Sequence, residues 1–95
     1  MRIRWVDRAL GEFDAEMGFI AADSEPAARL VAGRINHAVQ LLASNPALGR
    51  PGRVLGTREW PVTKTRYIIP YRVNALGELE ILSVFHTSRR PTKEW

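Results

Sequence analysis

The segment GTREWPVTKTRYIIPYRV (residues 56–73) carries a cation every few residues within runs that are otherwise apolar, and two more arginines follow the next apolar run. The cations in this pattern are Arg58, Lys64, Arg66, Arg72, Arg89 and Arg90. Arginine binds phosphate through a planar fork of N–H donors, and clustered cations attract acidic surfaces. The spacing indicates either recognition of an anionic target or partner, or the ordinary solvated face of a small sheet.

His86 stands before the last two of these arginines, in ILSVFHTSRRP (residues 81–91). Metal-independent cleavage of RNA needs a base for the 2′-hydroxyl, cations for the phosphate, and an acid for the leaving oxygen. Histidine titrates in the useful pH range. A nuclease would therefore draw its catalytic residues from Arg66, Arg72, His86 and Arg89. The competing interpretation, which sequence alone favours, is a strand-end histidine bonded to backbone, with the arginines in solvent.

Other chemistry has less support. Glu59 could supply a carboxylate base, but it neighbours Arg58 and is as readily explained as an ion-pair partner. There is no cysteine, no glycine-rich phosphate loop and no nucleophile elbow, and His37 and His86 lie far apart without further clustered ligands. We therefore expect no metal and no cofactor. Trp60 and Trp95 could stack on bases, although core and terminal anchoring explains them better.

Length and charge indicate one domain over residues 1–95 with an electrostatic asymmetry. The net charge is +4, and residues 50–95 hold nine Arg or Lys against four Glu, whereas residues 1–49 hold five against six acidic residues. The first ten residues contain no long apolar stretch, and no run approaches the roughly 20 apolar residues of a membrane span. We expect a soluble, cytoplasmic domain without a signal peptide.

The first half of the chain predicts a strand and two helices. Residues 3–6 read as a strand, and Asp7 offers an N-cap for a helix whose apolar stripe is Leu10, Phe13, Met17 and Ile20. Ser24 can cap a second helix, with Pro26 in its first turn. That helix runs to about Ala43, and its stripe is Ala28, Val31, Ile35, Val39 and Leu42. The short connection predicts an antiparallel helical hairpin.

The second half predicts a loop over residues 45–56 and strands over 57–62, 66–73 and 79–86. In the middle strand, alternation predicts an apolar face (Tyr67, Ile69, Tyr71 and Val73) that packs on Leu10, Phe13, Ile35 and Val39. The other face, which carries Arg66 and Arg72, is expected to be largely cationic and open to water or a partner. Pro70 cannot donate to a ladder, so we expect a bulge or a pairing gap there.

These segments resemble the RelE/ParE superfamily of bacterial type II toxins. The most specific parts are GRPGRV-x-GTRE (residues 49–59) and the ending YR-x₇-EIL-x-V-x-H-x-x-R (residues 71–89), and the resemblance covers nearly the whole chain. It implies an α+β fold, β-α-α-β-β-β, with the helical hairpin on one face of a small, largely antiparallel sheet. It also implies a growth-inhibiting toxin held inactive by a cognate antitoxin protein in a hetero-oligomer.

Two unrelated activities occur in that superfamily. RelE-like members are ribosome-dependent mRNA endoribonucleases, whereas ParE-like members poison DNA gyrase and are not nucleases. No tyrosine follows His86, and Ile68 stands where some nucleases carry an arginine, so the resemblance favours the gyrase branch. In that branch the six cations named above would serve recognition of target or antitoxin, and no residue would be catalytic. A third alternative is a non-toxic nucleic-acid-binding module.

Overall fold

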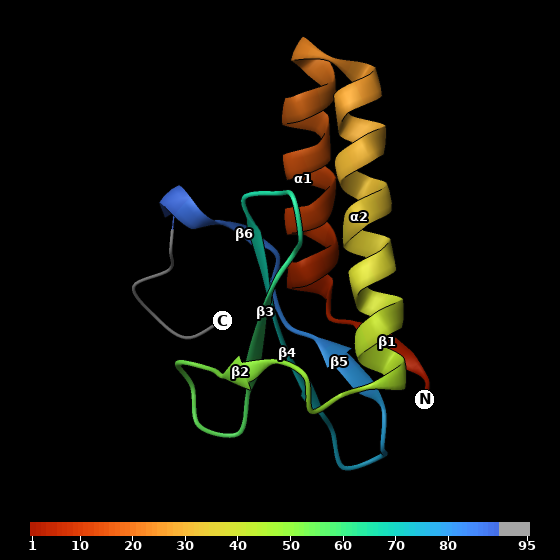
Figure 1. Cartoon of the computed structure of the whole chain (residues 1–95), viewed down its shortest axis with the longest axis vertical. Helices are drawn as coiled ribbons and strands as arrows, with labels where there is room; N and C mark the ends of the chain where they lie inside the picture. The colour runs from red at the N-terminus through yellow and green to blue at the C-terminus, as the bar shows by residue number, and fades with distance from the viewer. Residues whose placement is uncertain (90–95) are drawn as a thin grey trace.

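A computed structural model describes residues 1–89, which form two helices and a six-stranded sheet (Figure 1). The elements are β1 (Ile3–Trp5), α1 (Asp7–Asp23), α2 (Glu25–Ser44), β2 (Arg50–Pro51), β3 (Arg58–Pro61), β4 (Tyr67–Val73), β5 (Leu79–Ile81), β6 (Phe85–His86) and the 3₁₀ turn η1 (Thr87–Arg89). Arg90 and Trp95 lie outside the described residues. The predicted α+β architecture is confirmed, and within residues 1–89 neither helix is long and apolar enough to cross a membrane.

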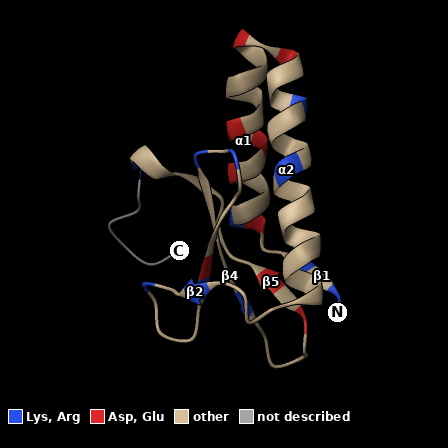
Figure 2. Cartoon of the chain, viewed as in Figure 1, with Lys and Arg blue, Asp and Glu red and all other residues tan. Residues whose placement is uncertain are grey.

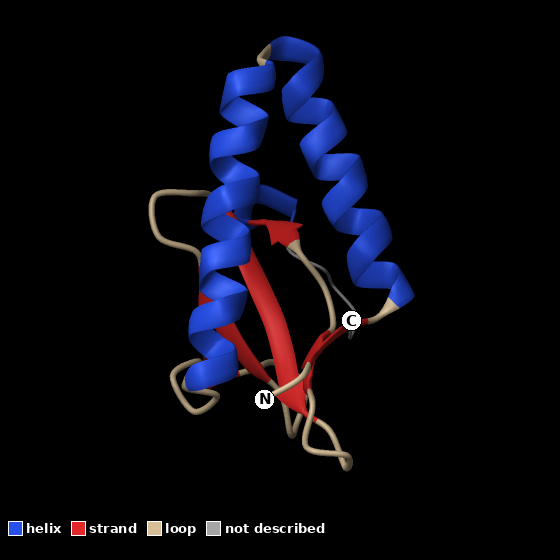
Figure 3. Cartoon of the chain, turned by 90° about the vertical axis from the view of Figure 1, so that its right-hand side faces the viewer, coloured by secondary structure: helices blue, strands red, loops and turns tan. Residues whose placement is uncertain are grey.

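The sheet runs in the order β1-β5-β4-β3-β2, and β6 pairs with the other end of β4. Every pairing is antiparallel except that of β1 with β5, which is parallel. The two helices run antiparallel, cover one face of the sheet and extend beyond its end (Figure 3). Two strand predictions need correction, because β2 lies inside the predicted loop 45–56 and the predicted strand 79–86 is divided into β5 and β6.

The helix starts differ in how they are capped. Ser24 caps α2 as predicted, since its Oγ accepts a hydrogen bond from the Ala27 N–H at 3.2 Å, and a proline occupies the first turn. The predicted cap at Asp7 is wrong. Val6 is the N-cap of α1 because its N–H is already bonded to the carbonyl of Ile81, which holds it extended. Asp7 is instead the first residue of the helix, where its negative charge interacts favourably with the positive end of the helix dipole.

The core lies between the hairpin and the helix-side face of β4. Tyr67, Ile69 and Tyr71 are buried there with Ile35 and Val39, as predicted, and Ile35 is 0% exposed. Phe13 is partly buried against this core. Leu10 and Val73 were expected in the core, but both are 46% exposed. Val73 is the last residue of β4, where the strand leaves the helices, and α1 is rotated so that Ala9 rather than Leu10 faces inward.

The break between β5 and β6 is a β-bulge opposite Pro70. Three residues, 82–84, lie opposite two residues of β4, Ile69 and Pro70. The carbonyl of Pro70 accepts from the N–H of residue 82, so the side of Pro70 that lacks an N–H faces the bulge and leaves no ladder bond unmade. The expected bulge is confirmed. Glu12 of α1 holds it in place, because one carboxylate oxygen accepts from the Ser83 hydroxyl at 2.7 Å and from the N–H of residue 84 at 3.2 Å.

The Tyr71 hydroxyl fixes the loop between α2 and β2. It accepts a hydrogen bond from the Gly49 N–H at 2.8 Å and donates one to the Pro46 carbonyl at 2.7 Å. A Cβ at Gly49 would lie 2.6 Å from that hydroxyl oxygen, so the close approach requires glycine. Burial raises the pKa of Tyr71, which keeps the hydroxyl protonated and able to donate.

Candidate functional site

The sheet face turned away from the helices holds a buried carboxylate, Glu80, between two arginines. Arg72 donates from Nε at 2.7 Å and Arg4 from Nη1 at 2.6 Å, while Glu80 itself is 5% exposed. The hydrogen bond from Arg72 is the largest of the effects that lower the pKa of Glu80, and bonds from Asn74 and Arg4 act in the same direction against the cost of burial. Arg72 therefore links β4 to β5 through its ion pair with Glu80.

A second buried carboxylate, Glu59, lies on the same face. Its oxygens accept from the Arg53 backbone N–H at 3.1 Å and from Arg50 Nη2 at 3.4 Å. With two buried glutamates, this face is not the largely cationic surface expected from alternation. Arg58 lies on the opposite face and donates from Nη1 to the Gly49 carbonyl at 2.8 Å, so it holds the same loop as Tyr71.

Lys64 and Arg66 belong to the turn between β3 and β4, where Figure 2 shows Lys and Arg at both ends of the turn, and Arg89 belongs to η1. There a cavity of about 380 Å³, here called the His86 groove, opens between this turn, η1 and the helices. Its lining residues are Glu16, Phe19, Ile20, Val31, Thr65, Arg66, Tyr67, His86, Ser88 and Arg89.

A shared carboxylate organises one wall of the His86 groove. Glu16 Oε1 accepts from the Tyr67 hydroxyl at 2.9 Å and from Arg89 Nη2 at 2.5 Å. Burial, followed by the contact with Glu16, raises the pKa of Tyr67 to about 12, so the hydroxyl remains a donor at neutral pH. Arg89 thereby ties η1 to α1. Arg66 is exposed and makes no hydrogen bond or ion pair from its side chain to any other residue between 1 and 89.

The environment of His86 fixes how its ring is used. Nδ1 accepts from the Ser88 backbone N–H at 3.1 Å and lies 2.7 Å from the Ser88 hydroxyl oxygen. The ring also meets Tyr67 edge-on, with centroids 5.4 Å apart. Because a backbone N–H points at Nδ1, the neutral ring carries its proton on Nε2, and that N–H is the group left to meet a ligand.

The four candidate nuclease residues do not converge on one point. Arg66, His86 and Arg89 line the His86 groove, but Arg72 lies across the sheet against Glu80. The register explains the separation, since His86 is paired with Tyr67 on the helix side whereas Arg72 faces the other way. The candidate base Glu59 is also on that other face.

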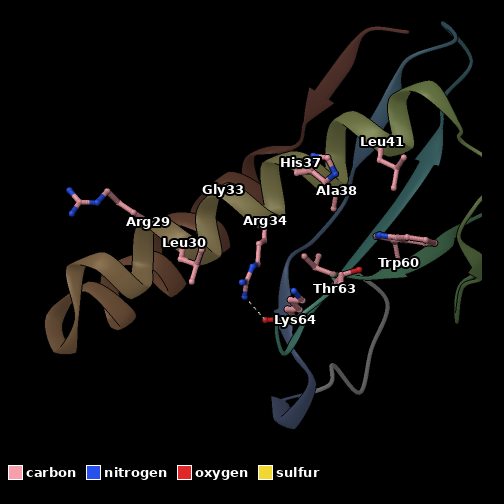
Figure 4. Close-up of a pocket in the computed structure, with 11 residues that line it drawn as sticks. Arg29, Leu30, Gly33, Arg34, His37, Ala38, Leu41, Trp60, Thr63 and Lys64 are labelled. Carbon is pink, nitrogen blue, oxygen red and sulfur yellow. Dashed lines mark hydrogen bonds between the residues drawn. The ribbon is translucent and has the colours of Figure 1, made fainter.

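A second cavity, the α2 groove, has a volume of about 480 Å³ and lies between α2 and the β3–β4 region (Figure 4). Its lining residues are Arg29, Leu30, Gly33, Arg34, His37, Ala38, Leu41, Trp60, Val62, Thr63 and Lys64. Arg34 Nη1 donates to the Lys64 carbonyl at 3.0 Å and so ties α2 to the turn, where Lys64 has a φ of 61°.

Sequence reasoning missed the α2 groove. Leu30 is 55% exposed and Leu41 36% exposed, and in Figure 4 both project from the groove side of α2, with Leu41 opposite Trp60. Their spacing of eleven residues places them on one helix face, distinct from the core stripe that includes Ile35. That second apolar stripe was the available signal. Trp60 packs partly against the core, as expected, and His37 is an exposed rim residue, as expected.

Comparisons with known proteins agree with this fold. Residues 3–91 match the family described as ParE toxin of type II toxin-antitoxin system, parDE. The chain is 45% identical over 89 residues to "Putative toxin Y4kP" of Sinorhizobium fredii, and the aligned region covers 94% of this chain and 91% of the relative. A solved structure described as "Chromosomal ParDE TA system from P. aeruginosa" superimposes with a TM-score of 0.79 at 26% identity, over 90% of this chain and 95% of that one.

The chain therefore belongs to the ParE toxin family, within the RelE/ParE superfamily that its sequence motifs resemble. It is the toxin component of a type II toxin–antitoxin system.

Proposed function

We propose that this toxin acts in the cytoplasm by poisoning DNA gyrase, and that a cognate antitoxin neutralises it. Membership of the ParE family supports the choice of target. The observation that carries it is the separation of His86 from Arg72 and Glu59, because a base, an acid and phosphate-binding cations must surround one scissile bond to cleave RNA. On this proposal the exposed cations recognise the target and no side chain transfers a proton.

One observation favours the alternative, a RelE-like mRNA interferase. Arg66, His86 and Arg89 share the His86 groove, so two cations and an imidazole could meet one phosphate. This alternative makes the protein an endoribonuclease and the ribosome its partner. It requires His86 to exchange a proton through Nε2, since Nδ1 is engaged with Ser88.

One experiment separates the two activities. The toxin is induced in cells, and trapped gyrase–DNA cleavage complexes are measured beside cleavage of ribosome-bound mRNA. We expect gyrase complexes from the wild type, and also from His86→Ala. An interferase would instead cleave mRNA promptly and lose about 10²–10⁴-fold in rate in His86→Ala, because one acid–base group typically contributes that much. That second result, without gyrase complexes, would refute the proposed target.

The α2 groove is the site we propose for the antitoxin. Its floor is apolar, with Leu30, Leu41 and Trp60, and its rim carries Arg29 and Lys64. Such a groove suits an amphipathic helix whose apolar face enters the groove and whose acidic side chains meet the rim. The acidic side chains of the antitoxin would thus meet Lys64, Arg29, whose ion pair with Glu25 is exposed, and the basic half of the chain.

Co-purification with the product of the neighbouring gene tests this docking. Leu30→Asp and Leu41→Asp each place an uncompensated charge in the apolar part of the groove, and each should weaken the complex about tenfold or more. Phe19→Asp, an apolar-to-acidic change at an exposed position outside the α2 groove, is the control. Loss of antitoxin binding in Phe19→Asp, with both leucine variants unaffected, would place the antitoxin elsewhere.

A further inference from the structure

The side of α2 that lines the α2 groove has the residue spacing of a helix contact surface. Its lining residues recur from Leu30 to Leu41, along about 16 Å of helix. Two sets of four, each at i, i+3, i+4 and i+7, follow one another: Leu30, Gly33, Arg34 and His37, then Arg34, His37, Ala38 and Leu41. Four neighbouring residues of this kind form a hole that receives one side chain of a facing helix. The α2 groove therefore presents two successive holes.

The glycine in the first hole is not required by the fold of the toxin. Apart from its chain neighbours and the helix backbone, a Cβ at Gly33 would meet no heavy atom within 4 Å among residues 1–89. Glycine is less favourable than alanine inside a helix, because it loses more backbone entropy when the helix forms. Gly33 thus lowers the stability of α2 without relieving any contact within this part of the chain.

The missing side chain deepens the first hole. In Figure 4, Gly33 lies on the groove side of α2 between the side chains of Leu30 and Arg34. Leu30 is 55% exposed and forms an apolar wall. Arg34 is turned aside toward the Lys64 carbonyl, to which its Nη1 donates at 3.0 Å, so its head group is held away from the hole. The space above Gly33 therefore suits a large apolar side chain.

We propose that Gly33 receives a large apolar side chain of the antitoxin helix, and that the absence of a side chain at Gly33 determines which helices the α2 groove accepts. This inference rests on the placement of the antitoxin in that groove, proposed above. A helix fits this wall better than an added strand, because the backbone groups of α2 are bonded within the helix and offer no edge for pairing. None of the lining residues, all between 29 and 64, is acidic and three are Arg or Lys, which complements acidic residues beside the apolar face of the partner helix.

Two measurements with opposite expected signs test the proposal: the Tm of the free toxin, and its affinity for the antitoxin encoded by the neighbouring gene. Gly33→Ala should raise the Tm by about 4–8 °C, because α2 gains stability and the new Cβ meets nothing. The same change should weaken antitoxin binding about tenfold, and Gly33→Leu about a hundredfold, since both fill the hole. Gly18→Ala is the matched control. Gly18 is an equally open glycine of α1 that lines neither groove, so this change should raise the Tm without affecting binding.

Variants of the antitoxin identify the side chain that occupies the hole. Truncation of its apolar residues to alanine should, at one position, restore part of the binding lost in Gly33→Leu. Equal losses of binding in Gly33→Ala and Gly18→Ala, or no truncation that restores binding, would overturn the proposal. If Leu30→Asp weakens the complex but Gly33→Leu binds as wild type does, the role of Gly33 is refuted while the antitoxin site stands. If Leu30→Asp and Leu41→Asp both bind normally, the antitoxin lies elsewhere and both proposals are refuted.

Discussion

Replacement of Tyr71 by phenylalanine should destabilise the fold far more than the loss of one oxygen atom suggests. The ring and its apolar contacts are retained, so the change isolates the hydroxyl, which bonds the Gly49 N–H and the Pro46 carbonyl. The Gly49 N–H is buried, and a buried donor without a partner costs about 1–3 kcal/mol. Loss of the partly buried bond to Pro46 adds about 0.5–1.5 kcal/mol. The expected loss of unfolding free energy is therefore about 2–4 kcal/mol.

Urea unfolding of the purified chain, followed by circular dichroism, measures this loss, and cell-free synthesis avoids toxicity during production. The midpoint should fall with an unchanged slope, and the Tm should fall by about 4–8 °C for each kcal/mol. Tyr67→Phe is the matched control, because Glu16 keeps its bond to Arg89 and little is left unpaired. If Tyr71→Phe is no less stable than Tyr67→Phe, the argument from the buried Gly49 N–H is refuted.

Three other changes test separate parts of the fold. Ile35→Ala should cost about 2–5 kcal/mol because the side chain is fully buried, whereas the exposed Leu30→Ala should cost little in the same urea titration. The pKa of Glu80 in the folded protein is held below its ordinary 4.5, so the ionised carboxylate contributes its full share of folding stability above that pH. This stability is lost as the pH falls through the lower folded pKa. Glu80→Gln should therefore flatten the acid-induced loss of stability in unfolding midpoints measured from neutral to acidic pH. Glu12→Ala should lower the unfolding free energy by about 1–3 kcal/mol and speed amide exchange at residue 84. Glu12→Gln keeps an acceptor oxygen, so both effects should be smaller. Equal effects of the two variants would contradict the role of Glu12 in the bulge.

Local patterns predicted the elements well. Apolar spacing placed both helices, and Ser24 marked the start of α2 because its capping chemistry is contained within four residues. Alternation in β4 assigned Tyr67 to the core, and the missing N–H of Pro70 predicted the bulge. Element bounds were less accurate, since the cap of α1 depends on a bond from Val6 to a strand far along the chain.

Sequence could not show which cation meets which acid. Arg72 and Arg58 look alike in the sequence, yet one neutralises Glu80 and the other holds the Gly49 carbonyl. These partners are set by strand register and by the return of the loop, which no local pattern encodes. The same limit applies to the candidate site, because the split of the nuclease set across two sheet faces follows from the pairing of His86 with Tyr67.

The parallel pairing of β1 with β5 has a consequence for synthesis of the toxin on the ribosome. Arg4 and Glu80 form an ion pair across this pairing although they are 76 residues apart in sequence. The strand β1 leaves the ribosome early, whereas its partner β5 is translated late. The entropy cost of closing so long a loop must be met before the contact contributes any stability. A nascent chain halted before β5 leaves β1 unpaired and the N–H of Val6 without its acceptor at Ile81. It also leaves the core without the buried side chains of Leu79, Ile81 and Val84. Incomplete translation therefore yields fragments that cannot assemble the folded toxin.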